Sequence, residues 1–320
     1  HSLHHYIESI KLFGTTDNYN TEFFERLHID FTKLGWRASN HRDEFPQMIR
    51  WLSRREKIAG FEAFQTLSHG SRAITPAPQK KASVLKMAKV PHYPGRDFPY
   101  IKETHDAPDF EFYLKQYLNR FTDKPVVQRL LDQIPLSFTK VNVYKMFRFH
   151  PEAMQDDEVE EDLVKAIPRS AALPHGHFDT VIVLVNDKAE SIGVAGTKVG
   201  RVKVIFKLPN TLDTPLGPRP LPSTWPQGPL AYIEWYSPLP RNAEARHGTM
   251  YRIKRQSGNQ QNRRPGSIVP LGNIRQSCML FPAFPREGVP SDWTSQNVLD
   301  LADAFYVNKW SSKYAYHTIY

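Results

Sequence analysis

The chain has 320 residues and a formal net charge of +9, since 42 lysines and arginines outnumber 33 acidic residues. Hydrophobic residues make up 40% and aromatic residues 12%, which excludes a disordered chain and predicts at least one packed core. The single cysteine, Cys278, excludes an intramolecular disulfide and favours a reducing compartment. The longest apolar run, at 181–185, is far too short to span a bilayer, and no signal-peptide pattern opens the chain. We therefore expect an intracellular protein that is neither secreted nor inserted in a membrane. Because it begins with His1, we expect it to be the tail of a longer protein.

Residues 1–60 are predicted to be helical. Between Thr21 and Leu34 the apolar residues recur at helical spacing, and complementary charges lie four positions apart on the other face. A second helix is predicted to follow Asn40, with Pro46 in its opening turn and Gly60 at its end. Residues 61–92 are predicted to form a basic linker, because Ser, Gly, Ala and Pro collect there without a sustained period.

Residues 93–137 are predicted to form a helical pair. Apolar residues follow the i, i+3, i+4, i+7 rule from 110 to 121, and Asp123 with Pro125 begins a shorter helix at 126–134. After Pro135 the apolar period changes to two, which is typical of strands.

Residues 138–320 are predicted to form a β-rich domain with Pro-rich turns. No βαβ alternation is present, so the sheet is predicted to be antiparallel and to curl into a small barrel or a sandwich. An acidic loop at 151–164 and a basic loop at 241–265 interrupt it. The fold class is α+β: N-terminal helical segments, then a predominantly antiparallel barrel- or sandwich-like domain. The predicted strands are 141–149, 178–185, 202–208, 230–236, 250–254, 277–280, 304–307 and 314–319.

Carboxylates near a histidine and a lysine make the first predicted helix a candidate catalytic segment. Glu25, or Glu22, would hold a divalent ion, while His28 and Lys33 would contact a nucleic-acid backbone. The alternative is that these charges pair on the surface of an amphipathic helix. We assign no metal site to the histidines near the N-terminus or to His175 and His177, because zinc needs three or four ligands of fixed geometry.

Two basic regions suggest a polyanionic partner, most simply DNA. Lysine and arginine neutralise phosphates and release counterions, whereas the alternative is a pair of solvated loops. The glycines at 193–200 do not form a nucleotide-binding loop, since a strand follows them rather than a helix. No cofactor and no small-molecule substrate are indicated. The candidate nucleic-acid-binding residues are Arg54, Arg55, Lys57, Lys80, Lys81, Arg252, Lys254, Arg255, Arg263 and Arg264.

Several blocks of the chain resemble the C-terminal part of fungal Plavaka transposases, which are relatives of the CACTA group. These blocks are residues 12–22, 25–30, 37–40, 43–45, 47–48, 176–181, 202–206, 231–236 and 268–271. In that family the region is usually catalogued as a domain of unknown function, and most of the RNase H-like catalytic domain lies upstream. The resemblance implies that 1–60 closes that domain, that Glu25 or Glu22 is the last carboxylate of its acidic triad, and that Mg²⁺ would bind only with the upstream part. Leu34-Gly35-Trp36 departs from the family pattern, as a decaying copy would.

These observations lead to two main hypotheses. In the first, the chain is the C-terminal accessory portion of a transposase-like protein, contacts DNA, chromatin or other transposase subunits, and is not an enzyme by itself because it lacks most of a DDE-type catalytic domain. Short basic clusters such as Arg54-Arg55 would then direct it to the nucleus. In the second, it is a protein-interaction module with no nucleic-acid role. A self-sufficient nuclease, a third reading, would need three converging carboxylates.

Overall fold

A computed structural model describes residues 7, 10, 28–68, 85–122, 124–151, 161–185, 193–214, 217–244, 248–258, 263–285 and 288–319. The chain there combines helices with sheets whose strand pairs are all antiparallel, so the α+β prediction is confirmed. None of the described helices is both long and apolar enough to cross a bilayer.

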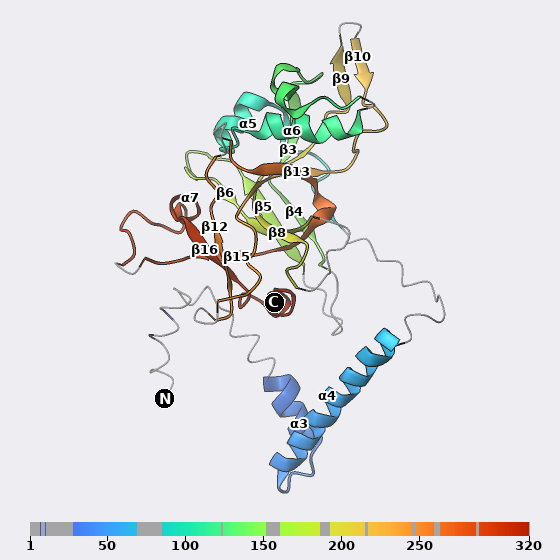
Figure 1. Ribbon diagram of the computed structural model, residues 1–320, viewed down its shortest axis with the longest axis vertical. Coiled ribbons are helices and arrows are strands. Elements are labelled where there is room, and N and C mark those ends of the chain that lie inside the picture. The colour runs from blue at the N-terminus through green and yellow to red at the C-terminus, as the bar shows by residue number, and fades with distance from the viewer. Residues whose placement is uncertain are drawn as a thin grey trace.

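The N-terminal helices lie apart from the sheets (Figure 1). They are η2 (His28–Lys33), a π-helical turn, then α3 (Leu34–Arg37) and α4 (Glu44–Ser68). α3 packs against α4 at Gly35, where a Cβ would lie 3.4 Å from Trp51 and 3.6 Å from Met48, which are ordinary van der Waals contacts. The helix continues eight residues beyond Gly60, because one glycine costs only about 1 kcal/mol and need not end a helix. The first part of the predicted linker is therefore helical.

A helical layer covers one side of the sheets. It consists of α5 (Phe98–Thr104), α6 (Phe110–Leu118) and the 3-10 turns η3 (Asn119–Phe121) and η4 (Gln128–Gln133). The predicted helix at 110–121 is confirmed with a 3-10 end, whereas the predicted helix at 126–134 is only a 3-10 segment. The sequence analysis missed α5, which Asp97 caps by accepting a 3.0 Å hydrogen bond from the Tyr100 amide.

The central sheet is built around β8 (Thr197–Lys207). One edge of β8 pairs with β11 (Leu230–Trp235), and the other pairs with β7 (Thr180–Leu184) and then β3 (Lys140–Tyr144). Further strands extend the sheet on each side: β2 (Tyr93–Asp97), β13 (Gly266–Pro270) and β14 (Ile274–Ser277).

Three smaller sheets and two short helices complete the fold. A four-stranded sheet has the order β1 (Lys86–Met87), β4 (Met146–Phe149), β5 (Asp162–Ile167), β6 (His177–Phe178). A three-stranded sheet has the order β12 (Tyr251–Lys254), β16 (Ala304–Asn308), β15 (Met279–Pro282). The hairpin β9 (Thr211–Thr214) and β10 (Gly217–Pro220), the 3-10 turn η6 (Leu271–Asn273), and helices α7 (Val298–Leu301) and α8 (Lys313–Thr318) are the remaining elements.

The apolar cores lie on both faces of the central sheet. On one face, α5 and α6 pack on the sheet, with Phe110 in contact with Phe206 and Tyr232 (Figure 1). On the other face, Phe147 of β4 and Val164 of β5 pack against the same sheet. The described strands stay in separate sheets and form no closed barrel, so the prediction of a barrel is not confirmed.

Three predicted strands differ from the structure. Residues 314–319 form α8, whose N-terminus Ser312 caps by accepting from the Ala315 amide; Ala315 and Ile319 are buried four residues apart, as on a helix. The predicted strands 141–149 and 277–280 each divide between two sheets, because the chain changes sheet at Lys145 and at Cys278. The acidic loop ends earlier than predicted, since β5 begins at Asp162.

Candidate functional site

The described candidate residues lie on three segments of the chain. Arg54, Arg55 and Lys57 lie on α4, Arg252 and Lys254 lie on β12 with Arg255 just after it, and Arg263 and Arg264 precede β13. Glu22, Glu25, Lys80 and Lys81 lie outside the described residues. The structure therefore does not gather the candidate cations into one patch.

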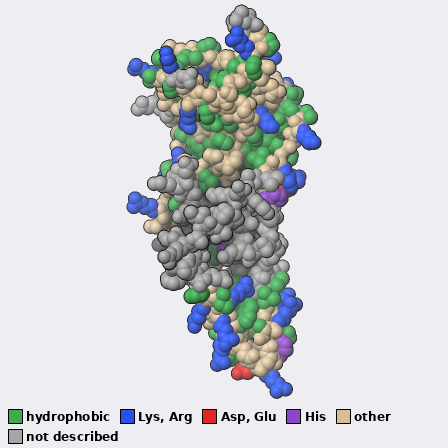
Figure 2. Space-filling model, turned by 90° about the vertical axis from the view of Figure 1, so that its right-hand side faces the viewer, with side chains coloured by type: hydrophobic (Ala, Val, Ile, Leu, Met, Phe, Trp, Pro, Cys, Tyr) green, Lys and Arg blue, Asp and Glu red, His purple; other side chains and the backbone are tan. Residues whose placement is uncertain are grey.

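On α4, three exposed cations form a cationic stripe, defined here as Arg50, Arg54 and Lys57. Their spacing of i, i+4 and i+7 places them on one helix face over about 10 Å. Within the described residues, no carboxylate pairs with any of the three. Arg55 lies on a different face, with its guanidinium 5.6 Å from the rings of Phe31 and Trp51. Figure 2 shows blue side chains around the helical end of the molecule.

Arg263 and Arg264 turn inward and bind carboxylates. Arg263 donates to Asp132 at 2.6 Å and lies 3.8 Å above the ring of Phe112. Arg264 donates to Asp106 at 3.0 Å and lies 3.4 Å from Glu234. A phosphate would have to compete with these acids, so this part of the basic loop stabilises the fold.

Arg252 and Lys254 are the exposed cations of β12, because their neighbours Tyr251 and Ile253 point into the core. Arg255 lies 3.5 Å from Asp303, whose side chain is 96% exposed. An ion pair this exposed contributes little to stability. These three residues therefore remain accessible to a partner.

Several layers of the fold meet at a cavity of about 640 Å³, which we call the charged cavity. Asp106 comes from the turn between α5 and α6, Arg201 from β8, Glu234 from β11, and Asp300 from α7. Beneath it lies Lys203 of β8, only 1% exposed. The remaining residues of its lining are Pro108, Asp109, Arg169, His175, Trp235, Tyr236, Arg255, Gln256, Ser257, Gly258, Arg264, Pro265, Leu299 and Asp303.

Asp106 is the centre of the ionic network around this cavity. Its Oδ2 atom lies 3.0 Å from Arg264, 3.3 Å from Lys203 and 3.7 Å from Arg169. Burial alone would raise the pKa of Asp106, but the charges and hydrogen bonds of Lys203 and Arg264 lower that pKa below its ordinary value. Its backbone has φ 47°, a left-handed conformation that aspartate tolerates better than most residues.

Glu234 and Lys203 are titratable groups shifted in opposite directions. Burial raises the pKa of Glu234, although Lys203 and Arg264 oppose that shift. Burial lowers the pKa of Lys203, although Glu234 opposes it. Shifts of this kind cluster at functional sites but also accompany structural ion networks. Next to Asp106, the imidazole of His105 is fully buried, and burial together with Lys203 lowers its pKa to about 3.

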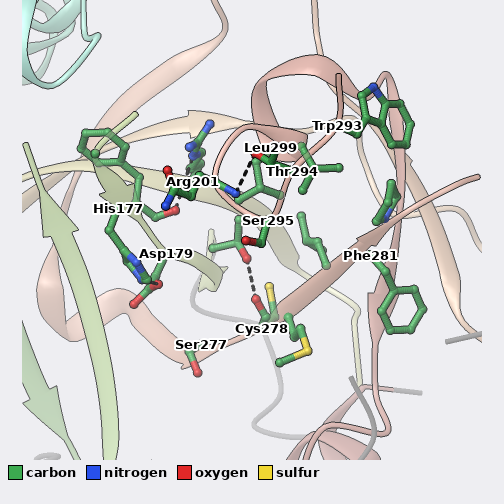
Figure 3. A pocket seen from close by; sticks show the side chains of 18 of the residues that line it. His177, Asp179, Arg201, Ser277, Cys278, Phe281, Trp293, Thr294, Ser295 and Leu299 are labelled. Carbon is green, nitrogen blue, oxygen red and sulfur yellow. Dashed lines mark hydrogen bonds and ion pairs between the residues drawn. The ribbon is translucent and has the colours of Figure 1, made fainter. Parts of the chain in front are cut away.

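A second, more apolar cavity of about 1010 Å³ lies between β6 and β15 and extends to residues 289–299. Figure 3 shows His177 and Asp179 on one wall and Trp293 and Phe281 on the other. The His177 Nε2 atom lies 2.8 Å from Asp179, which also accepts from the Lys165 amide at 2.7 Å. These bonds fix the geometry of the turn between β6 and β7, and no described group of three or more His, Cys, Asp or Glu residues could hold a metal ion.

Cys278 lines the second cavity but is not a reactive thiol. Its side chain is buried, and burial raises its pKa to about 12. Among the described residues, neither Ser277 nor Cys278 makes a hydrogen bond to His177, and Figure 3 draws none. Nucleophilic catalysis would need such a contact.

The charged cavity was not predicted from the sequence. Arg201 and Lys203 occur in the alternating pattern of β8, where the polar positions of a half-buried strand would ordinarily face water. Both are buried instead, because the helical turn carrying Asp106 and the helix carrying Asp300 cover that face. One feature of the sequence could have indicated this cavity. Arg201 and Lys203 lie within one long apolar strand and Glu234 lies within another, and charges on central strands need buried partners.

A comparison with protein families finds one match: a family described as a domain of unknown function, DUF6830, matches residues 61–254. This range contains the helical layer, most of the central sheet and half of the charged-cavity lining, but it begins after the cationic stripe. No curated protein matches the chain, and no solved structure matches it.

Proposed function

The chain belongs to the DUF6830 family, a domain of unknown function, and from its charge and its blocks of resemblance we propose that it is a C-terminal accessory portion of a transposase-like protein that contacts DNA. In this proposal the protein derives from a fungal transposable element of the Plavaka type and acts in the nucleus at DNA or chromatin. Most of the catalytic domain lies in the part of the transposase upstream of this region.

The observation that carries this proposal is the cationic stripe of α4. Arg50, Arg54 and Lys57 share one exposed face and have no carboxylate partner within the described residues. Backbone phosphates recur at a spacing that a stripe of about 10 Å can follow, and each neutralised phosphate releases counterions. Arg252 and Lys254 supply a second exposed cationic pair on β12.

The test is the salt dependence of duplex binding, followed by fluorescence anisotropy of a labelled duplex. Wild-type protein is expected to bind with an affinity that falls steeply as KCl rises. The variant Arg50→Gln/Arg54→Gln/Lys57→Gln is expected to bind more weakly, and its slope of log K against log salt is expected to be smaller by about 2.7, which is about 0.9 for each of three lost phosphate contacts.

A control variant removes one cation that the fold already uses. Arg263→Gln removes one positive charge of the basic loop that is bound to Asp132. It is expected to keep the wild-type salt slope, even if it melts at a lower temperature. The proposal fails if the triple variant keeps the wild-type slope, or if the control loses as much of the slope as the triple variant does.

Exposed apolar side chains on the same helix favour the second candidate function, a protein-interaction module. Phe45, Ile49 and Ile58 are 70%, 49% and 59% exposed, respectively, on a helix that contacts α3 but lies apart from the sheets. Exposed apolar side chains that gather on one element are typical of a protein interface. Weak, salt-insensitive DNA binding together with a protein partner lost in Phe45→Ser/Ile49→Ser would support this function instead.

A further inference from the structure

One edge of the central sheet is predominantly positive. β2 is the last strand at this edge in the described sheet, and four of its five residues are exposed. The segments around it, 85–105 and 139–150, hold seven lysines and arginines against two acidic residues, Asp97 and Glu103. Two of the seven, Lys86 and Arg148, pair with Glu161 of β5. The other five have no carboxylate partner within the described residues.

A β-bulge in β2 turns Tyr93 and Arg96 to the same face of the sheet. Tyr93 lies opposite Val143 and Arg96 lies opposite Val141, so three steps along β2 match two steps along β3. In a regular strand, residues three positions apart point to opposite faces, and the extra residue of a bulge removes this difference. The bulge and Pro94, which has no N–H, also disfavour the pairing of a further strand. This edge therefore offers side chains to a partner rather than backbone.

Four side chains at this edge contact one another, and we call them the edge cluster: Tyr93, Arg96, Tyr100 and Lys145. The Arg96 guanidinium lies 4.8 Å from the ring centre of Tyr100 and 5.8 Å from that of Tyr93. The Lys145 Nζ atom lies 5.3 Å from the same Tyr93 ring. Because both cations lie beside one ring, they are at most about 11 Å apart. Their positive charges therefore converge on one place.

Both cations of the edge cluster keep their hydrogen-bond donors available. Neither Arg96 nor Lys145 has a side-chain hydrogen bond or an ion pair within the part of the chain that the structure describes. A cation–π contact uses the face of the ring, so the five N–H donors of the guanidinium and the three of the ammonium can still meet an anion. Two like charges held this close repel each other, and a polyanion relieves that repulsion.

We infer that the edge cluster binds a single-stranded nucleic acid, with neighbouring backbone phosphates on Arg96 and Lys145 and a base stacked on the Arg96 guanidinium. Single strands are held by cations that follow the backbone and by planar side chains on which bases stack. The guanidinium of Arg96 and the half-buried rings of Tyr93 and Tyr100 supply such planar groups. In a duplex the bases stack on one another, so only a single strand can use both kinds of group.

Fluorescence anisotropy on the whole chain tests this surface with two labelled probes: an oligothymidine strand, and an abasic strand of the same length that has the phosphates without the bases. Wild-type protein is expected to bind the thymidine strand more tightly. Arg96→Gln/Lys145→Gln is expected to weaken its binding by about tenfold or more. The slope of log K against log salt is expected to be smaller by about 1.4, which is about 0.7 for each of two lost phosphate contacts.

Two further variants separate charge from stacking and from position. Arg96→Lys keeps the charge but removes the planar group, so it is expected to keep the salt slope and to lose preference for the thymidine strand. Lys198→Gln/Lys309→Gln is the matched control, because it also removes two cations that lie over aromatic rings, 5.7 Å from Trp235 and 5.3 Å from Trp310. Lys198 lies at the other end of β8, and Lys309 follows β16. The control is expected to bind both strands as the wild type does.

If Arg96→Gln/Lys145→Gln does not fold, the single change Arg96→Gln serves instead, since Arg96 is exposed. Its salt slope is expected to be smaller by about 0.7. The inference is overturned if the edge variants bind the thymidine strand as the wild type does, or if the matched control loses as much affinity. Equal binding of the thymidine and abasic strands by the wild type would also overturn it, since the bases would then contribute nothing.

A labelled polyglutamate peptide distinguishes a nucleic acid from an acidic protein. If the wild type binds this peptide but not the thymidine strand, and Arg96→Gln/Lys145→Gln loses the peptide, the surface takes an acidic protein and the inference is overturned. Stronger binding of the thymidine strand than of the peptide supports the inference.

Failure of this site and failure of the proposed function are distinguishable, because the inference does not rest on α4. The family match at 61–254 contains the whole edge cluster but begins after the cationic stripe. The α4 triple variant is expected to keep the preference for the thymidine strand, and Arg96→Gln/Lys145→Gln is expected to keep the salt slope of duplex binding. Preference for the thymidine strand in a protein with no salt-dependent duplex affinity would support the edge cluster and contradict the function proposed for α4.

Discussion

Asp106→Asn is expected to lower the free energy of unfolding by about 3 kcal/mol. The change removes the one carboxylate that Lys203, Arg264 and Arg169 share, and Lys203 is 1% exposed. A buried charge that loses its partner costs several kcal/mol, whereas the pair itself would contribute little net stability. Asparagine keeps the size of the side chain and tolerates the left-handed backbone at this position, so the loss reports charge rather than strain.

Urea denaturation of three variants checks this result. Asp303→Asn is the control, since it removes a carboxylate that also pairs with an arginine but is 96% exposed; it is expected to leave the midpoint unchanged. In the double variant Asp106→Asn/Lys203→Met the buried cation that lost its hydrogen-bonded carboxylate is gone, so part of the lost stability is expected to return. A small effect of Asp106→Asn, or no recovery in the double variant, would show that Lys203 is not held by this network.

A histidine next to this network gives the second large effect, on the pH dependence of stability. Burial lowers the pKa of His105 to about 3 from an ordinary value of 6.5, so the folded state keeps the ring neutral while the unfolded state protonates it below pH 6.5. The stability due to the neutral ring is therefore complete above pH 6.5 and is lost as the pH falls towards 3. At pH 4.5 the expected loss is about 2.7 kcal/mol, which is two pH units at about 1.36 kcal/mol each.

The measurement compares wild type with His105→Gln between about pH 7 and about pH 4.5. Glutamine does not titrate, so the stability of the variant is expected to fall by about 2.7 kcal/mol less than that of the wild type over this interval. Asp106, whose pKa is lowered, titrates in both proteins and cancels in the difference. Parallel stability curves for the two proteins would contradict a buried neutral His105.

The helical and strand periodicity of the sequence correctly predicted α6 and β8, which pack against each other. The pattern of α6 follows one buried face, and the pattern of β8 includes Val204 and Phe206, which pack against that face. A strand was wrongly predicted at 314–319, because tyrosines alternate there as they would along a strand. The segment is helical, and Ser312 caps its N-terminus. The helix predicted to end at Gly60 was too short, since α4 continues to Ser68.

The site could be predicted only in part, because its partners are distant in the sequence. Arg263 meets Asp132 across 131 positions, and Arg264 meets Asp106 across 158. A count of charges in the loop at 241–265 cannot show that its last arginines are used inside the fold. On α4 the i, i+4, i+7 spacing places Arg50, Arg54 and Lys57 on one face, whereas the candidates named from the sequence were Arg54, Arg55 and Lys57, and Arg55 lies against Phe31 and Trp51 instead.

The central claim, that the α4 stripe is the surface that meets DNA, is tested most directly by cleavage of DNA from a tethered reagent. The native thiol of Cys278 is buried, so a single introduced cysteine can be labelled selectively with an iron chelate. Ser53→Cys lies next to the stripe on α4, and Val90→Cys lies in an exposed position, 73% accessible, on the body of the protein. The account predicts strand cleavage of a bound duplex from position 53 and little from position 90. Equal cleavage from both, or none from position 53 with the duplex bound, would contradict it.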